Sequence, residues 1–158
     1  MKKFFVSIAI ALLLVIVIKG MGLAALARTE ASGRFTSTSV IYTVTEDKFN
    51  EVIDLSSTVT YTGTLEGTST LQGTLTVHRD GSATFRGIET FTGLVDGIPG
   101  KLTFEVVGNS NLYQASQLTS TITSSTGGLT SIQGMLSMTG IIKDNGPFGT
   151  YTGQIDYE

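Results

Sequence analysis

Short runs in which apolar and polar residues alternate recur along most of this chain, and they constrain its fold more than any other feature. In residues 100–108, for example, Leu102, Phe104 and Val106 alternate with mostly polar neighbours. The runs are bounded by Gly, Asn, Asp or Ser, and no stretch after residue 27 has the apolar spacing of a helix. This pattern predicts an all-β chain built of half-buried strands.

We predict eight strands, joined by connections short enough to make sequence neighbours antiparallel. They span residues 34–45, 52–62, 67–78, 82–92, 100–108, 112–123, 132–141 and 148–157. The clearest turn contains Asp80-Gly81, a dipeptide that supplies the positive φ angles of a tight hairpin. The longest loop-like segment is the Ser/Thr/Gly cluster 124–131.

The composition of the strands favours a closed sheet. Thr occurs 25 times and Ser 14 times in residues 28–158, so each strand has a polar, Thr-rich face opposite its apolar face. A flat sheet of this kind has two exposed edges, whereas a barrel has none. Gly73, Gly87, Gly134 and Gly153 lie on apolar faces, where glycine often marks a bend or a close approach. We therefore predict an eight-stranded antiparallel β-barrel over residues 34–158, with a β-sandwich as the alternative.

The first 27 residues have the layout of a secretory signal peptide. Lys2 and Lys3 precede an apolar run over residues 4–18, and Ala25-Leu26-Ala27 supplies small residues before a cleavage site. We predict cleavage after Ala27, a short linker over 28–33, and a secreted or periplasmic protein. The alternative is an anchored protein that faces away from the cytoplasm and contacts the membrane only through residues 4–18.

Charge and composition exclude several kinds of function. The chain has no Cys, one His and a formal charge of −3, which becomes −6 when the three lysines of the first 27 residues are removed. Disulfides, thiolate metal sites and His-rich metal sites are therefore excluded. We predict no cofactor, no metal and no nucleic-acid partner.

Three segments resemble a family of short bacterial domains of unknown function. They are Tyr-Thr-Gly-Thr-Leu-Glu-Gly-Thr-Ser at 61–69, the run 78–97 that begins His-Arg-Asp-Gly-Ser-Ala-Thr-Phe-Arg-Gly, and Gly-Thr-Tyr-Thr-Gly-Gln-Ile-Asp-Tyr-Glu at 149–158. The family is similar in fold to allene oxide cyclase and the dirigent proteins, which are eight-stranded antiparallel barrels. The resemblance implies this fold and no activity. No catalytic residue of allene oxide cyclase is matched, and the export signal departs from most relatives.

Glu89 is the weak catalytic candidate. By alternation it shares an inward face with Phe85 and Phe91, and a carboxyl in apolar surroundings has a raised pKa and can act as a general acid or base. The other interpretation places Glu89 near the barrel mouth, or pairs it with an arginine such as Arg79.

The predicted interior suits a small ligand, because it is apolar and carries few polar groups, which are Glu89, Tyr61 and Tyr151. We predict a non-catalytic binder of a small, mostly apolar molecule. The predicted contacts are Phe85, Glu89, Phe91, Phe104 and Tyr151. The alternatives are a cofactor-free cyclase or isomerase and a structural envelope protein that forms homo-oligomers through its Thr-rich outer face.

The remaining polar residues give weaker signals. His78 lies on a polar face next to the Asp80-Gly81 turn, without a nucleophile motif, and we expect it to be exposed. Two carboxylate pairs, Glu51 with Asp54 and Asp156 with Glu158, could supply the two carboxyl groups that a glycosidase uses. The chain has no Trp to stack on a sugar, so we expect these acids to be solvated surface groups. Glu46-Asp47 with Glu51 and Asp54 lacks the loop pattern of calcium sites.

Overall fold

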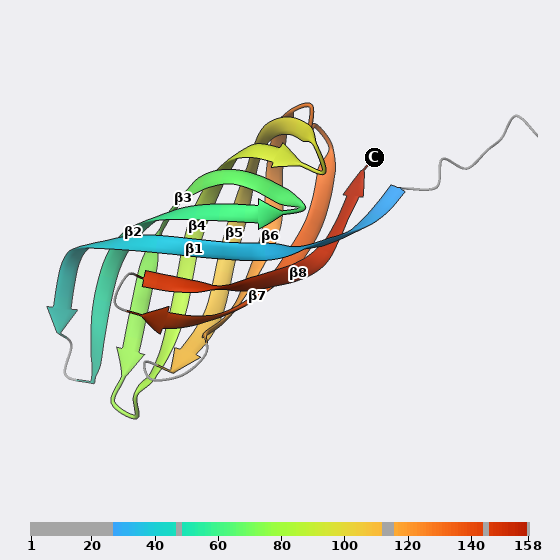
Figure 1. Cartoon of the computed structure of the whole chain (residues 1–158). Coiled ribbons are helices and arrows are strands. Elements are labelled where there is room, and N and C mark those ends of the chain that lie inside the picture. Colours follow the sequence, from blue (N-terminus) through green and yellow to red (C-terminus); the bar gives the residue numbers. More distant parts are fainter. Residues whose placement is uncertain (1–26, 47–48, 112–115, 144–145, 158) are drawn as a thin grey trace, which may run out of the picture.

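A computed structural model describes residues 27–46, 49–111, 116–143 and 146–157, which form a closed antiparallel barrel (Figure 1). Neighbours in sequence are neighbours in the sheet, and β1 closes against β8. The strands are β1 (Ala27–Glu46), β2 (Asn50–Gly63), β3 (Leu65–His78), β4 (Ser82–Val95), β5 (Ile98–Asn111), β6 (Ser116–Gly127), β7 (Ile132–Lys143) and β8 (Gly146–Tyr157). The predicted barrel is confirmed, and the β-sandwich alternative is wrong.

The strand bounds differ most from the prediction at β1. This strand begins at Ala27 because residues 27–36 pair with β8, so residues 28–33 are strand and not linker. Hairpin signals along the chain do not show this closing pair. In the cluster 124–131, β6 continues to Gly127 before the turn. Residues 112–115, predicted as strand, and the signal segment 1–26 lie outside the described residues.

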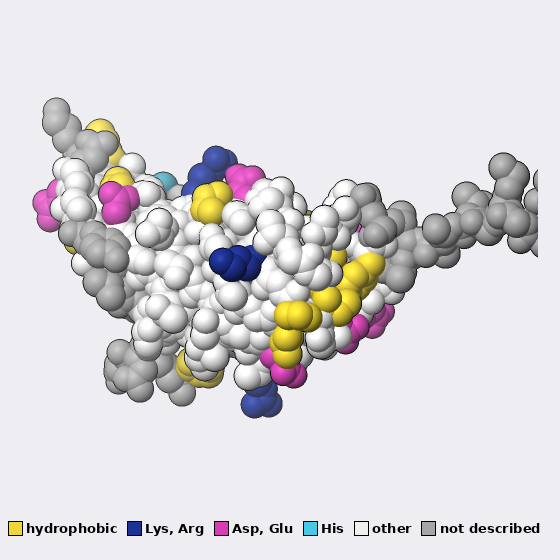
Figure 2. Space-filling view, turned by 90° about the horizontal axis from the view of Figure 1, so that it is seen from above, with side chains coloured by type: hydrophobic (Ala, Val, Ile, Leu, Met, Phe, Trp, Pro, Cys, Tyr) yellow, Lys and Arg dark blue, Asp and Glu magenta, His cyan; other side chains and the backbone are white. Residues whose placement is uncertain are grey.

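Alternation sorts the side chains as predicted. Odd-numbered positions of β4, including Phe85, Glu89 and Phe91, are buried, while the even-numbered Thr84, Thr90 and Thr92 are exposed. Figure 2 shows one face of the molecule, on which uncharged polar side chains and backbone predominate and charged groups are scattered. Among the described residues, there is no helix long and apolar enough to cross a membrane.

Aromatic rings fill the space that inward-facing glycines leave. A Cβ atom at Gly73 would lie 2.6 Å from Phe85 Cζ, and one at Gly87 would lie 2.9 Å from the same atom. Phe91 covers Gly93 in the same way, at 2.8 Å. These glycines are close-approach positions, and each aromatic ring packs directly on backbone.

Turn chemistry is also close to the prediction. Asp80 Oδ1 accepts hydrogen bonds from the Ser82 backbone N–H at 2.9 Å and from its hydroxyl at 2.6 Å. These bonds lower the pKa of the Asp80 carboxyl. Of the dipeptide Asp80-Gly81, only Gly81 has a positive φ, at 81°. One left-handed residue is therefore sufficient for this hairpin.

The barrel has two unlike halves. The closed half is the end at which β4 turns into β5, and five of its side chains are fully buried: Leu65, Phe91, Val95, Leu129 and Ile155. Leu129 comes from the β6–β7 turn and covers this end. The open half is the end at which β3 turns into β4, and its inward side chains Leu55, Leu75 and Leu118 are only partly buried.

Candidate functional site

Glu89 lies between the two halves and is 1% exposed. Its Oε1 atom accepts a hydrogen bond from the Tyr61 hydroxyl at 2.8 Å and another from the Ser69 hydroxyl. Among the described residues, Oε2 accepts none. The interpretation that places Glu89 at the mouth or pairs it with Arg79 is wrong, since Arg79 lies 4.7 Å from the centre of the Phe49 ring.

Burial raises the pKa of the Glu89 carboxyl, and the hydrogen bonds from Ser69 and Tyr61 act in the opposite direction. Burial, followed by the nearby Glu89 charge, raises the pKa of the Tyr61 hydroxyl well above its ordinary value. Tyr61 therefore stays a hydrogen-bond donor at physiological pH. Both hydrogen bonds end on Oε1, so when the carboxyl is protonated its proton is expected on Oε2.

A layer of polar atoms extends from Glu89 across the barrel. The Ser120 hydroxyl lies 3.3 Å from Met138 Sδ, which is 3.8 Å from the Tyr61 hydroxyl. Sequence analysis missed Ser69 and Ser120 as partners in this layer. Alternation places Ser69 on the same face as Leu71, but the abundance of serine made that signal easy to overlook.

Tyr151 ties strands together. Its hydroxyl accepts a hydrogen bond from the Leu65 backbone N–H at 2.8 Å and donates one to the Thr62 carbonyl at 3.2 Å. Its ring meets that of Tyr61 edge-on, with centroids 5.6 Å apart. Burial raises the pKa of the Tyr151 hydroxyl. The predicted ligand contact thus already has both of its hydrogen-bonding roles satisfied by backbone.

The other predicted contacts also point inward. Phe91 and Phe104 are at most 1% exposed and belong to the packed core. Phe85, 7% exposed, is the one that lies on the side of Glu89 facing the open half. Phe85 therefore forms a floor between Glu89 and the open half.

The open half carries a polar atom without a partner. Ser110 follows Val106 on the inward face of β5, opposite the buried Ala83 of β4. Its hydroxyl oxygen is buried and has no hydrogen-bond partner among the described residues. A buried hydroxyl of this kind is usually satisfied by a protein group, a water molecule or a ligand.

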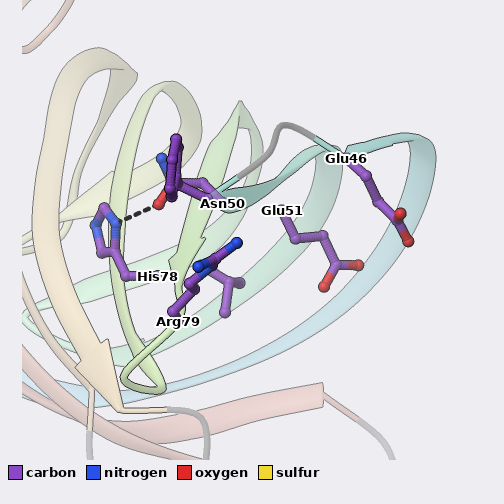
Figure 3. Close-up of a pocket in the computed structure, with 7 residues that line it drawn as sticks. Glu46, Asn50, Glu51, His78 and Arg79 are labelled. Carbon is purple, nitrogen blue, oxygen red and sulfur yellow. Dashed lines mark hydrogen bonds between the residues drawn. The ribbon is translucent and has the colours of Figure 1, made fainter.

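A hollow of about 280 Å³ lies at the mouth of the open half (Figure 3). It is lined by Glu46, Phe49, Asn50, Glu51, Val77, His78 and Arg79. His78 is half-buried rather than exposed, and its Nδ1 lies 2.9 Å from Asn50 Oδ1. Because an amide oxygen only accepts, Nδ1 is the donor in this hydrogen bond.

The predicted carboxylate pairs are not assembled as catalytic pairs. Glu51 lines the hollow, whereas Asp54 is three residues further along β2 and accepts a hydrogen bond from the Thr74 hydroxyl at 2.7 Å. Asp156 pairs with Arg28 at 3.2 Å, and its predicted partner Glu158 lies outside the described residues, as does Asp47. The described residues include no group of three or more His, Asp or Glu side chains placed to hold a metal ion.

The comparison with sequence families gives one assignment. Residues 31–152 match the family described as "Protein of unknown function (DUF3224)". No curated protein matches the sequence.

Solved structures of the same fold include a DUF3224 protein of unknown function from Shewanella oneidensis MR-1. It is 20% identical, with a TM-score of 0.68 over 83% of this chain and 98% of that chain. The pterocarpan synthase dirigent protein GePTS1 is 14% identical, with a TM-score of 0.51 over 87% of this chain and 92% of that one. PsPTS1, another such dirigent protein, is 14% identical, with a TM-score of 0.50 over 83% and 96%. At these identities the likeness shows the fold alone.

Proposed function

Because this chain belongs to the DUF3224 family, whose description assigns no activity, we propose a function from the barrel itself: it binds a small, mostly apolar molecule in its open half. One observation carries the proposal. Leu65, Phe91, Val95, Leu129 and Ile155 are fully buried in the closed half, where Tyr157 at the end of β8 is partly buried. In the open half three inward leucines, Leu55, Leu75 and Leu118, are only partly buried. Inward apolar side chains that remain partly accessible to solvent favour binding of an apolar ligand, because the ligand removes their surface from water.

The chemistry of the open half describes that guest further. Apolar walls and the Phe85 floor suit a hydrocarbon or aromatic body, and the Ser110 hydroxyl suits one hydrogen-bonding group on it. The hollow at the mouth, about 280 Å³, is just below the range of about 300–1,000 Å³ that is usual for small-molecule sites, so it suits only a small guest. A ligand held here would have its polar group near Ser110, or near His78 and Asn50 at the entrance.

Binding without catalysis fits the position of Glu89. A proton-transferring group must come within hydrogen-bond reach of its substrate. Leu71, 9% exposed, lies directly opposite Glu89 on β3, and Phe85, 7% exposed, lies on its open-half side. Tyr61 and Ser69 already bond its carboxyl. These contacts support a structural role for Glu89 and favour a binder over a cyclase or isomerase.

The proposal is tested by native mass spectrometry of the protein recovered from its own exported fraction. We expect a stoichiometric small-molecule adduct that is lost on denaturation. The mass of the chain also tests export, since processing after Ala27 gives a protein that starts at Arg28. A bare protein at its calculated mass would contradict the binding proposal, and an intact Met1 start would contradict processing.

A titration with a small neutral fluorophore, 1-aminoanthracene, tests the location of the site. Leu75→Trp fills the open half and should abolish the saturable fluorescence increase of the wild type. Ile88→Trp is the matched control, because Ile88 is 52% exposed on the outer face of β4. Loss of binding in both variants, or in neither, would contradict the site.

A further inference from the structure

Over residues 39–46, β1 has an edge at the mouth that pairs with no strand of the described residues, and we call it the free edge. β1 pairs with β8 only as far as Thr36 opposite Phe148, while its pairing with β2 continues to Glu46 opposite Glu51. Figure 1 shows β1 and β2 continuing past the start of β8 and bending away from it. Within the described part of the chain, no strand pairs with the outer edge of residues 39–46.

This edge is apolar and poorly protected. Ile41 and Val44 are 59% and 50% exposed, and Phe49 at the end of the same hairpin is 62% exposed. Exposed edges are usually protected by lysine, proline, bulges or inward-pointing charges. Residues 39–46 contain no Lys, Arg or Pro, and their protection is limited to Glu46 and a bulge between Ile41 and Thr43.

We propose that two copies of this chain pair along residues 39–46 of β1, antiparallel about a two-fold axis. An antiparallel pair of identical edges offers each backbone the same pattern of donors and acceptors, and it closes after two copies. The pairing covers Ile41 and Val44 with the equivalent residues of the second copy. It reduces the exposure to water of Ile41 and Val44, which are 59% and 50% exposed.

The charges of the edge select this arrangement. In antiparallel pairing centred on the stretch, Glu46 of one copy lies opposite Ser39 of the other, so the two carboxylates are at opposite ends. Parallel pairing would place the Glu46 carboxylates side by side, where like charges repel. An extended peptide is the other possible occupant of a free edge, but nothing in the described residues selects a peptide sequence, whereas the edge is complementary to itself.

Pairing also adds a strand beside the mouth. Glu46 and Phe49 line the hollow and belong to the same hairpin as the free edge. A second strand on this edge lies on the side of β1 that faces away from β2 and β3, next to the end of the hairpin that carries Glu46 and Phe49.

The oligomeric state of the full, processed protein tests the proposal, by light scattering with size exclusion at about 1 to 100 μM, a range set by the affinity of ordinary dimers. We expect a dimer in the wild type, and a monomer in Val44→Lys, with the dissociation constant raised about tenfold or more. The control Ile88→Lys places the same charge at a residue that is 52% exposed on β4, and should stay dimeric. A monomeric wild type, or equal behaviour of the two variants, would overturn the proposal.

The absence of cysteine gives a second, positional test. In Thr43→Cys the introduced thiol is the only one in the chain, and Thr43 lies near the centre of the free edge. Oxidation should link two copies through a disulfide in this variant but not in Thr90→Cys, whose residue is exposed on the outer face of β4. Equal cross-linking in both variants, none in Thr43→Cys, or a wild type that is monomeric and carries an extended peptide, would overturn the arrangement.

Discussion

The closed and open halves of the barrel are built by the same eight strands, yet they bury their side chains to different extents. In the closed half Leu65, Phe91 and Val95 are fully buried, while in the open half Leu55 and Leu75 are only partly covered. Stability is seldom uniform across a protein, and binding elements are drawn from its less stable parts. The comparison indicates that the closed half contributes more to stability, and it is in the open half that we propose a ligand binds.

The difference has a structural cause. At the closed end, Leu129 from the β6–β7 turn covers the interior, and Phe91 packs on the backbone of Gly93. At the open end β1 diverges from β8 after Thr36, so the sheet is not closed at the level of residues 39–46. In the part of the chain that the structure describes, β1 has no strand partner on that side, and the nearby Leu55, Leu75 and Leu118 are only partly buried.

The most direct test compares truncations in the two halves. Phe91→Ala should lower the free energy of unfolding by about 3–5 kcal/mol, because a buried ring leaves a cavity on the glycine backbone. Leu75→Ala should cost about 1 kcal/mol, since less buried area is lost. Urea denaturation measures both. Equal losses would break the distinction between the halves.

A smaller effect is expected from Tyr151, whose hydroxyl ties β8 to the β2–β3 turn at the closed end. Tyr151→Phe removes one hydroxyl and leaves the Leu65 N–H and the Thr62 carbonyl without it. An unsatisfied buried donor costs about 1–3 kcal/mol. Urea denaturation should show a loss in this range with an unchanged far-ultraviolet circular dichroism spectrum. A loss below about 0.5 kcal/mol would mean that water replaces the hydroxyl.

Glu89→Gln tests the boundary between the halves through pH. The folded state raises the Glu89 pKa above its ordinary value of 4.5, so it binds that proton more tightly than the unfolded chain. The resulting stability is fully present below pH 4.5 and is lost as pH rises through the raised pKa. The stability of Glu89→Gln relative to wild type should therefore rise by about 1.4 kcal/mol per pH unit in that window. Denaturation curves at a series of pH values check this, and parallel pH profiles would contradict it.

The sequence predicted the barrel well because strand alternation and turn residues are local signals. The inward placement of Phe85, Glu89 and Phe91 follows from period two alone, and burial confirms it. The start of β1 at Ala27 was not predicted, since it depends on pairing with the far end of the chain. A closing strand pair leaves no mark in either strand taken by itself.

The candidate site was less predictable, because it depends on which inward positions are covered. Glu89 and Leu75 both face inward, but Glu89 is fully buried and Leu75 is only partly buried. Likewise, His78 and Asn50 are far apart in sequence and meet only because β2 and β3 pair with this register. The catalytic and ligand-binding roles predicted for inward residues stay predictions.

The smallest expected effects on stability come from one polar pair at each end of the barrel. Because the two pairs should contribute equally to stability, a difference in ligand binding between their variants reports on the site alone. Arg28 and Asp156 form an ion pair at the closed end, with Arg28 66% exposed, and His78 bonds Asn50 at the open end. Arg28→Ala and His78→Ala should each cost about 0–1 kcal/mol, since exposed or half-exposed pairs contribute little. Their effects on 1-aminoanthracene binding should separate, because only His78 lines the hollow: His78→Ala should weaken binding and Arg28→Ala should not. If both variants bind as the wild type does, the mouth hollow is not part of the site, and the ligand enters deeper, toward Ser110 and Phe85.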